Sequence, residues 1–218
     1  MGVVMSVLTV ATHKGGTGKT LLCQLLACSL AGTCRMVVLD ADPTGAFSRW
    51  ASRAYEGPTF DTVAEADEAR LAHLIAQRAE TADLVIVDTA GFGNRAASVA
   101  MTSADAVLVP ALAGEADITE AERTMQLTEA LARAARRDIP ARVVLNRVKR
   151  TTLARHALAE LTAAGLPRLT ASLSDLVAFG ELTYSGRLPE SGPAVAEVAT
   201  LIAELRGLGW LPELRHHV

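Results

Sequence analysis

The sequence predicts an α/β fold, a doubly wound, mostly parallel β-sheet with helices on both faces. Short apolar segments alternate along the chain with longer helix-like segments, which is typical of this fold class. The apolar segments are continuous, as expected of parallel strands that are covered on both faces. Half of the 218 residues are hydrophobic, enough for a sizeable core. Because no repeat or linker interrupts the pattern, we expect residues 1–218 to form a single domain.

The individual elements follow from this alternation. Because apolar residues run together there, strands are predicted at 3–10, 36–39, 84–88, 106–109 and 142–145, with a weaker one at 168–173. Helices are predicted between and after them, at 19–31, 63–80, 94–102, 117–136, 152–164, 175–185 and 193–206. Open α/β sheets bind ligands beyond the carboxyl ends of their strands. The polar motifs that follow four of these strands, at 13–20, 40–44, 88–91 and 146–150, should therefore form one site.

Residues 13–20, His-Lys-Gly-Gly-Thr-Gly-Lys-Thr, form a predicted phosphate-binding loop between the first strand and the first helix. Its glycines allow successive backbone N–H groups to point at one anion, and the N-terminus of the next helix adds partial positive charge. Lys19 can reach the terminal phosphates of a nucleotide, and the Thr20 hydroxyl suits Mg²⁺. The predicted nucleotide-binding residues of this segment are Gly15, Gly16, Thr17, Gly18, Lys19, Thr20 and Leu21.

The same loop contains a second lysine, Lys14, although the whole chain has only three. The segment 14–20 resembles the deviant Walker A motif of the ParA/MinD family of ATPases. Segments 36–43, 84–91 and 143–147 resemble that family's switch I, Walker B and adenine-side strands. The pattern is most similar to small ParA proteins of plasmid partition, with VirC1-like proteins of DNA transfer close. The resemblance implies a P-loop NTPase fold with ATP and Mg²⁺ as cofactors.

Three positions depart from the family's pattern: Thr44 stands where glutamine is usual, Leu21 where a second threonine is common, and Ala90 where proline is frequent. None of these changes removes a group that would bind phosphate or Mg²⁺. Thr44 bears on how fast hydrolysis runs.

Lys14 is the distinctive residue of this loop. By the resemblance it crosses a homodimer interface and touches the partner subunit's ATP, where its charge would offset the charge of the transferring phosphoryl group. The plain alternatives are a lysine that neutralises phosphate in its own loop and a solvated lysine. The predicted catalytic residues are Lys14, Lys19 and Asp42.

Three aspartates follow predicted strands. Asp88 ends an apolar strand, where an unpaired carboxylate is costly but a Mg²⁺ ligand is natural. Asp40 and Asp42 point to opposite sides of an extended segment and should do different work. By the resemblance, Asp42 orients or activates the attacking water and Asp40 holds the Mg²⁺ region. The predicted metal residues are Thr20, Asp40 and Asp88; the alternative for each aspartate is a helix cap or a turn.

Asn146 and Arg147 are predicted to flank the adenine, because an asparagine amide can read the base edge. A strand-end turn is the alternative. The candidate DNA contacts are Arg147, Lys149, Arg150, Arg155, Arg168 and Arg187. No aromatic residue is interleaved with them, so any binding should be independent of base sequence. Arg133, Arg136 and Arg137 form another basic group at the end of a predicted helix. For these, stabilisation of the helix dipole by cations is the alternative to DNA binding.

The net charge of −3 argues against a uniformly basic nucleic-acid binder, and the three cysteines lack metal-ligand spacing. No signal peptide or membrane span is visible, so a cytoplasmic protein is expected, associated with the nucleoid when ATP is bound. Gly207, Gly209 and Pro212 break the C-terminal segment, which argues against a membrane anchor and favours packing of Trp210 onto the domain.

These observations lead to one principal hypothesis: a ParA-like ATPase that dimerises with ATP, binds DNA non-specifically, and segregates or positions a plasmid, chromosome or protein cargo. A ParB-like or other partner protein would stimulate its hydrolysis. The alternatives are a MinD-like membrane-associated positioning ATPase and a VirC1-like accessory protein of DNA transfer. A redox or metal-handling relative is close to excluded, since no cysteine follows Cys34.

Overall fold

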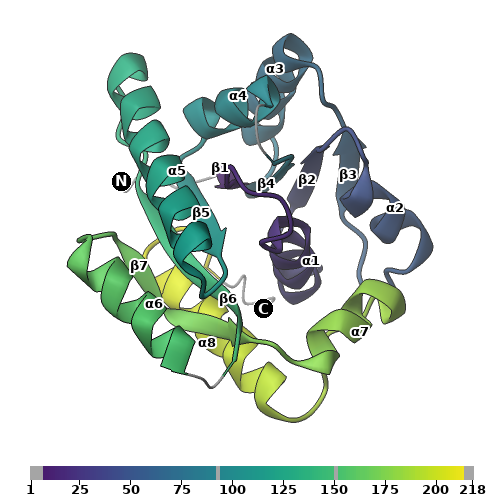
Figure 1. The fold of residues 1–218 in the computed structure, drawn as a ribbon. Coiled ribbons are helices and arrows are strands. Elements are labelled where there is room, and N and C mark those ends of the chain that lie inside the picture. The colour runs from purple at the N-terminus through teal and green to yellow at the C-terminus, as the bar shows by residue number, and fades with distance from the viewer. Residues whose placement is uncertain (1–6, 92–93, 150–151, 214–218) are drawn as a thin grey trace.

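The computed structural model describes residues 7–91, 94–149 and 152–213. Strands and helices alternate along them (Figure 1). The strands are β1 (Val7–Val10), β2 (Met36–Ala41), β3 (Asp61–Ala64), β4 (Leu84–Thr89), β5 (Ala106–Ala111), β6 (Ala141–Val148) and β7 (Arg168–Ser174). The helices are α1 (Lys19–Leu30), α2 (Ala46–Arg53), α3 (Glu68–Ala79), α4 (Arg95–Ser103), α5 (Glu115–Ala135), α6 (Thr152–Ala163), α7 (Val177–Ser185) and α8 (Pro193–Gly207).

The seven strands form one sheet in the order β3-β2-β4-β1-β5-β6-β7, and every neighbouring pair is parallel. The predicted fold class is therefore confirmed. The register aligns Asp88 of β4 with Asp40 of β2 on one side and with Val10 of β1 on the other. Since the phosphate-binding loop follows Val10 directly, three of the predicted motifs meet at the centre of one sheet edge.

Helices cover both faces of the sheet, as predicted. Helices α1, α2, α7 and α8 supply the largest buried cluster on one face, and α3, α4, α5 and α6 supply those on the other. The tail after α8 returns to the first cluster, where Trp210 and Leu211 are 3% and 4% exposed. The prediction that Trp210 packs onto the domain is thus confirmed. No helix within the described ranges is both long and apolar enough to cross a membrane.

Two elements are not predicted from the sequence. The predicted helix 63–80 begins too early, because residues 61–64 form the edge strand β3 and the helix starts only at Glu68. Strand β3 has no apolar run to reveal it, since two of its four residues are exposed. Helix α2 buries only Phe47 and Trp50, too few positions to show a clear period. The first four residues of the predicted strand 3–10 lie outside the described residues.

The opposite edge strand, β7, is covered by carboxylates from α8. Glu204 accepts hydrogen bonds from the backbone N–H groups of Thr170 and Ala171, at 2.8 and 2.7 Å. Glu197, two turns earlier, accepts from the N–H and the hydroxyl of Ser174, at 2.7 and 2.6 Å. Side chains thereby satisfy donors that an edge strand would otherwise present to another chain.

Candidate nucleotide-binding site

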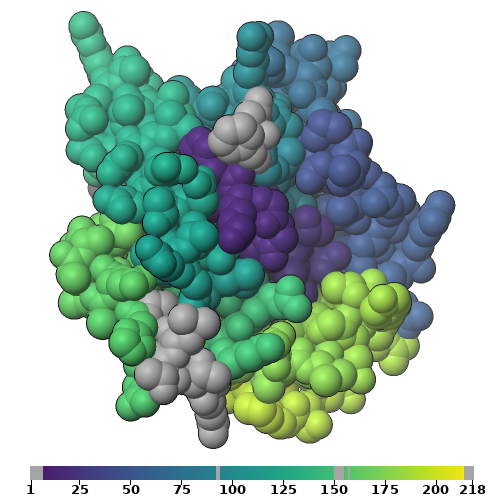
Figure 2. Space-filling view, in the orientation of Figure 1, coloured from purple at the N-terminus to yellow at the C-terminus, as the bar shows by residue number. Residues whose placement is uncertain are grey.

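The phosphate-binding loop lies at the surface beyond the carboxyl ends of β1 and β4. In Figure 2 the purple loop is open to solvent between teal and blue segments of the chain. Gly16 and Gly18 have φ values of 80° and 93°, in the left-handed region that favours glycine. Helix α1 then starts at Lys19 with Gly18 as N-cap, no side-chain cap and no acidic residue in its first turn. Its first N–H groups are therefore left to face an anion.

Gly18 is fixed by more than its backbone angle. A Cβ atom there would lie 2.0 Å from Nδ2 of Asn146, an impossible contact. The same Nδ2 donates a hydrogen bond of 2.8 Å to the carbonyl of Thr17. The end of β6 therefore clamps the loop in place.

We expect Gly18→Ala to lower ATP affinity about tenfold or more, because the strained backbone and the displaced Asn146 cost on the order of 1–3 kcal/mol. Titration with a fluorescent ATP analogue measures this loss. Gly180→Ala, in α7 and outside the nucleotide site, is the control, since a Cβ atom at Gly180 would meet nothing within 4 Å. An unchanged affinity in Gly18→Ala would contradict the clamp.

The Lys19 side chain already curls over the loop. Its ammonium donates a hydrogen bond of 3.1 Å to the carbonyl oxygen of Lys14, and only 7% of the residue is exposed. Burial lowers the pKa of Lys19, while the carboxylates of Asp88 and Asp42 act in the opposite direction. The ammonium therefore lies among acidic groups in the place where terminal phosphates are expected.

Asp88 is the most unusual group of the site. It is fully buried, and neither carboxylate oxygen accepts a hydrogen bond of normal geometry from the described residues. Burial raises the pKa of Asp88 to about 7; the Thr20 hydroxyl and the Lys19 ammonium oppose the rise, and the Asp40 carboxylate adds to it. A buried carboxylate that accepts no hydrogen bond of normal geometry and lies beside a threonine hydroxyl fits a hard divalent cation such as Mg²⁺. Cys23 lies one turn beyond Thr20, and burial raises the pKa of its thiol well above its usual range.

The other two predicted aspartates are engaged in backbone contacts. Asp40, 1% exposed, accepts hydrogen bonds from the N–H groups of Asp42 (3.3 Å) and Ser48 (2.8 Å), so it ties the end of β2 to the first turn of α2. Asp42 accepts from the N–H of Thr44 at 2.8 Å and is only partly buried. Asp40 thus shapes residues 40–45, the switch segment, while Asp42 remains more accessible.

Across the described residues no group of three or more His, Cys, Asp or Glu side chains could hold a metal ion. A cation at Asp88 would need phosphate and water oxygens to complete its shell.

Lys14 pairs within its own chain. Its ammonium lies 2.9 Å from Oδ1 of Asp117, in the first turn of α5. Two turns further along α5, the Thr124 hydroxyl contacts His13, with 3.1 Å to the backbone nitrogen and 3.2 Å to Nδ1. The start of the loop is therefore anchored on α5. Asp117 and Thr124 are not predicted from the sequence, because nothing local marks contacts with residues more than 100 positions away.

Asn146 is buried, and both the nitrogen and the oxygen of its amide are hydrogen-bonded within the chain. Besides the bond to Thr17, its Oδ1 accepts from the N–H of Arg147 at 2.9 Å. Arg147 has a left-handed φ of 52°, and its Nε lies 3.5 Å from Asp175. In this structure Asn146 thus acts on the loop, and recognition of adenine by this pair stays a prediction.

Among the described residues, the candidate DNA contacts are spread over the end of β6, α6, the start of β7 and the segment after α7. Arg147 and Lys149 share Asp175 as an ion-pair partner at the end of β6. Arg155 is exposed on α6, Arg168 is half-buried at the start of β7, and Arg187 pairs with Glu56 beyond α2. Arg150 lies outside the described residues.

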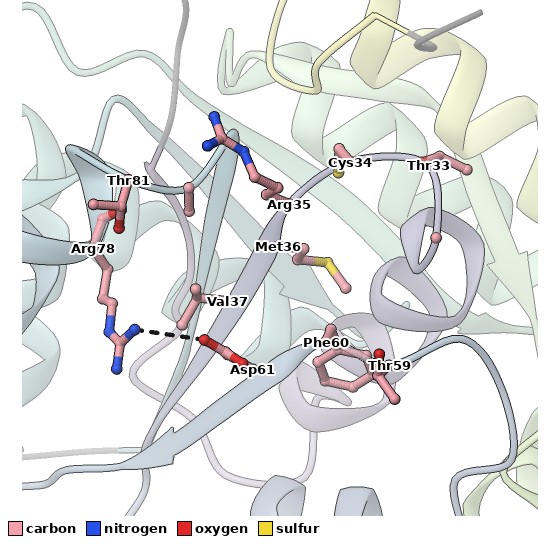
Figure 3. A pocket seen from close by; sticks show the side chains of 12 residues that line it. Thr33, Cys34, Arg35, Met36, Val37, Thr59, Phe60, Asp61, Arg78 and Thr81 are labelled. Atoms are coloured by element: carbon pink, nitrogen blue, oxygen red, sulfur yellow. Dashed lines mark hydrogen bonds and ion pairs between the residues drawn. The ribbon is translucent and has the colours of Figure 1, made fainter. Parts of the chain in front are cut away.

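A separate cavity of about 570 Å³ lies at the other edge of the sheet, at the amino ends of β2 and β3 (Figure 3). Arg78 and Asp61 form an ion pair of 3.5 Å across it, and Met36 and Phe60 contribute apolar walls. None of the predicted site residues lines this cavity. The residues predicted to bind nucleotide and Mg²⁺ therefore lie away from this cavity.

Comparison with known proteins agrees with this geometry. A family model described as VirC1 protein matches residues 5–203. Protein virC1 of Rhizobium rhizogenes is 29% identical over 192 residues, which cover 84% of this chain and 83% of that protein. A ParA protein of Rhizobium radiobacter is 31% identical over 124 residues, 56% of each. The structure of a Cyanothece McdA variant in complex with ATP has the same fold, with a TM-score of 0.80 at 17% identity, covering 99% of this chain and 100% of that one. The chain belongs to the VirC1 family, within the ParA/MinD class of P-loop ATPases.

Proposed function

We propose that this protein is a Mg²⁺-dependent ATPase that dimerises with ATP, binds DNA without sequence preference, and segregates or positions a DNA or protein cargo. The observation that carries the proposal is a two-lysine phosphate loop beside Asp88, a buried carboxylate whose oxygens accept no hydrogen bond of normal geometry from the described residues. A P-loop explains Lys19, and the second lysine, Lys14, which pairs with Asp117 within the single chain, is proposed to find its functional acceptor in the partner subunit's nucleotide.

The residues have distinct roles in this scheme. Thr20 and Asp88 would hold Mg²⁺, which when bound polarises the terminal phosphates. Lys19 would exchange the Lys14 carbonyl for phosphate oxygens, and the loop N–H groups would bind the remaining charge. Asp42, the accessible acid of the switch segment, would orient the attacking water. Lys14 would leave Asp117 for the nucleotide of the partner subunit.

DNA contacts would come from the basic residues around β6 and α6 and from Arg187, which follows α7. Individually such contacts are weak and salt-dependent, but a dimer doubles them, so binding can require ATP without any new contact within one subunit. A ParB-like or other partner protein is proposed to stimulate hydrolysis.

The test is binding to non-specific duplex DNA with ATP, with ADP and without nucleotide, using Asp42→Ala to slow hydrolysis. We expect binding with ATP only, weakening by a factor of about 10³ or more between 50 and 200 mM salt for six or more phosphate contacts. Arg155→Ala, an exposed change outside the nucleotide site, should weaken binding and leave ATP affinity unchanged. Equal binding in all three nucleotide states would contradict the proposal.

The family match favours a second candidate, an accessory protein of DNA transfer of the VirC1 type, in which nucleotide binding matters more than turnover. Thr44 in the switch segment is compatible with slow turnover. A hydrolysis rate that rises severalfold with a partner protein would count against it. A membrane-positioning role has less support, since Trp210 is buried in the core.

A further inference from the structure

Helix α2 is attached at its N-terminal end to the switch segment. The Asp40 carboxylate binds the N–H groups of both Asp42 and Ser48, so one side chain joins β2, the switch and the helix. Gly45, with a φ of 61°, is the N-cap of α2 and donates its N–H to the carbonyl of Asp42 at 2.8 Å. A displacement of residues 40–45 must therefore displace the start of α2.

The middle of α2 is attached to α7. The indole Nε1 of Trp50 donates a hydrogen bond of 3.0 Å to the carbonyl of Leu182, 132 residues away. Trp50 is 5% exposed and packs against the rings of Phe47 and Tyr55, each with a centroid distance of 5.3 Å. The contact is therefore part of a packed aromatic cluster and not a loose surface bond.

The C-terminal end of α2 is pressed against the segment that follows α7. A Cβ atom at Gly186 would lie 1.9 Å from the carbonyl oxygen of Ala54, so the two backbones touch. The N–H of Glu56 donates to the carbonyl of Gly186 at 3.4 Å. The Glu56 carboxylate pairs with Arg187, whose Nε lies 2.9 Å away. Arg187 is one of the candidate DNA contacts.

The switch segment has a physical reason to differ between ATP and ADP. The carboxylate of Asp42 interacts electrostatically with Lys19 and with Asp88, so it lies within range of the terminal phosphate position. An added negative phosphate at Lys19 repels that carboxylate unless the cation or a water intervenes. ADP lacks this phosphate. The preferred position of residues 40–45 therefore depends on which nucleotide is bound.

We propose that α2 transmits this difference to α7 and Arg187, with Trp50 as the principal positioning residue. Packed helices shift as rigid bodies by about 1–2 Å and do not deform. Because α2 is attached to the switch segment at its start and to α7 along its middle and end, a shift of the switch segment moves α7. Val177 and Tyr184 of α7 are 79% and 86% exposed, so a shift there changes a surface that another molecule can read. The coupling rests on the proposed nucleotide binding and gives Arg187 a nucleotide-dependent position.

Hydrogen–deuterium exchange of residues 177–187, read by mass spectrometry, tests the coupling without DNA. The wild-type chain is compared with Mg²⁺ and either ADP or the non-hydrolysable analogue AMP-PNP, and the particle mass is measured in parallel. We expect the exchange of this segment to differ at least twofold between the two nucleotides. Identical exchange would overturn the proposal.

The decisive variant is Trp50→Phe, which keeps one aromatic ring and removes the N–H donor together with the second, buried ring. Leu182 still accepts the N–H of Gly186 at 3.0 Å, so no buried carbonyl is orphaned. We expect the difference in exchange to fall by half or more in Trp50→Phe at unchanged AMP-PNP affinity and particle mass. Trp210→Phe, a change at the other buried tryptophan, should keep the full difference. An undiminished difference in Trp50→Phe would overturn the proposal.

Glu56→Gln, an exposed change, tests the same coupling if Trp50→Phe does not fold. It releases Arg187, and we expect DNA binding with ADP to rise severalfold, so that ATP and ADP are discriminated less. Unchanged discrimination would contradict the coupling to Arg187. If no DNA binds in any state while the exchange difference persists and depends on Trp50, the proposed DNA function falls and the coupling stands.

Discussion

Lys14→Ala should abolish ATP-dependent dimerisation and lower the hydrolysis rate by roughly 10²–10³-fold, the usual loss when one preorganised charge is removed from a transition state. Binding of ATP to a single subunit should change little. The contact that Lys14 makes in its own loop is through its backbone carbonyl, which Lys19 uses and which alanine retains. Size-exclusion chromatography with light scattering measures the dimer, and phosphate release measures turnover.

Asp117→Asn should have the opposite effect on dimerisation to Lys14→Ala. In the single chain, Asp117 holds the Lys14 ammonium at 2.9 Å, and the side chains of Lys14 and Asp117 are 38% and 10% exposed. Removing the carboxylate releases Lys14 before it meets a second subunit, so dimers should form at a several-fold lower protein concentration. A partly exposed pair contributes only up to about 1 kcal/mol, which limits the gain to about fivefold.

If Lys14→Ala dimerises and turns over like the wild type, the trans role of Lys14 is wrong.

Asp88→Asn should abolish Mg²⁺-dependent nucleotide hydrolysis and, at the same time, stabilise the nucleotide-free protein above pH 7. Because the pKa of Asp88 is about 7 in the folded chain, against 3.8 for an unperturbed aspartate, the folded state binds its proton more tightly than the unfolded state does. The protonated group therefore imposes no penalty at low pH. The penalty of ionising it grows as the pH rises from about 4 to 7 and is complete above that range.

Asparagine has no charge to bury, so the variant should gain on the order of 2–4 kcal/mol at pH 8 and almost nothing at pH 4. For a chain of this size the gain corresponds to a rise of roughly 5–15 °C in Tm at pH 8. Thermal unfolding at both pH values, without nucleotide, measures it. Adding Mg²⁺ and ATP should raise the Tm of the wild type more than that of the variant. An equal Tm for both proteins at pH 8 would show that Asp88 is not an uncompensated acid.

The parts of the site that the sequence predicted are those that lie close together along the chain. Gly18, Lys19 and Thr20 belong to one short loop, and its chemistry follows from residue types and spacing alone. Asp88 was predictable because a carboxylate that ends an apolar strand needs an explanation wherever the strand lies in the sheet. The parallel sheet followed from the same apolar runs.

The missed parts depend on contacts between distant segments. Asp117 and Thr124 belong to an ordinary acidic helix surface, and only the packing of α5 beside the loop gives them partners. Asn146 was predicted for its amide, but its use as a clamp on Thr17 requires the register of β6 against the loop. Strand β3 and helix α2 are short and half exposed, so tertiary contacts decide their structure rather than periodicity.

The carboxylates that α8 places along β7 also restrict how copies of this chain can join. A strand from a second molecule could extend the sheet only by displacing Glu197 and Glu204 from the backbone donors they occupy. Open-ended growth of the sheet into a fibre is therefore disfavoured at this border. This protection is compatible with the proposed dimer, whose interface is the rim that carries the phosphate loop and not the β7 border.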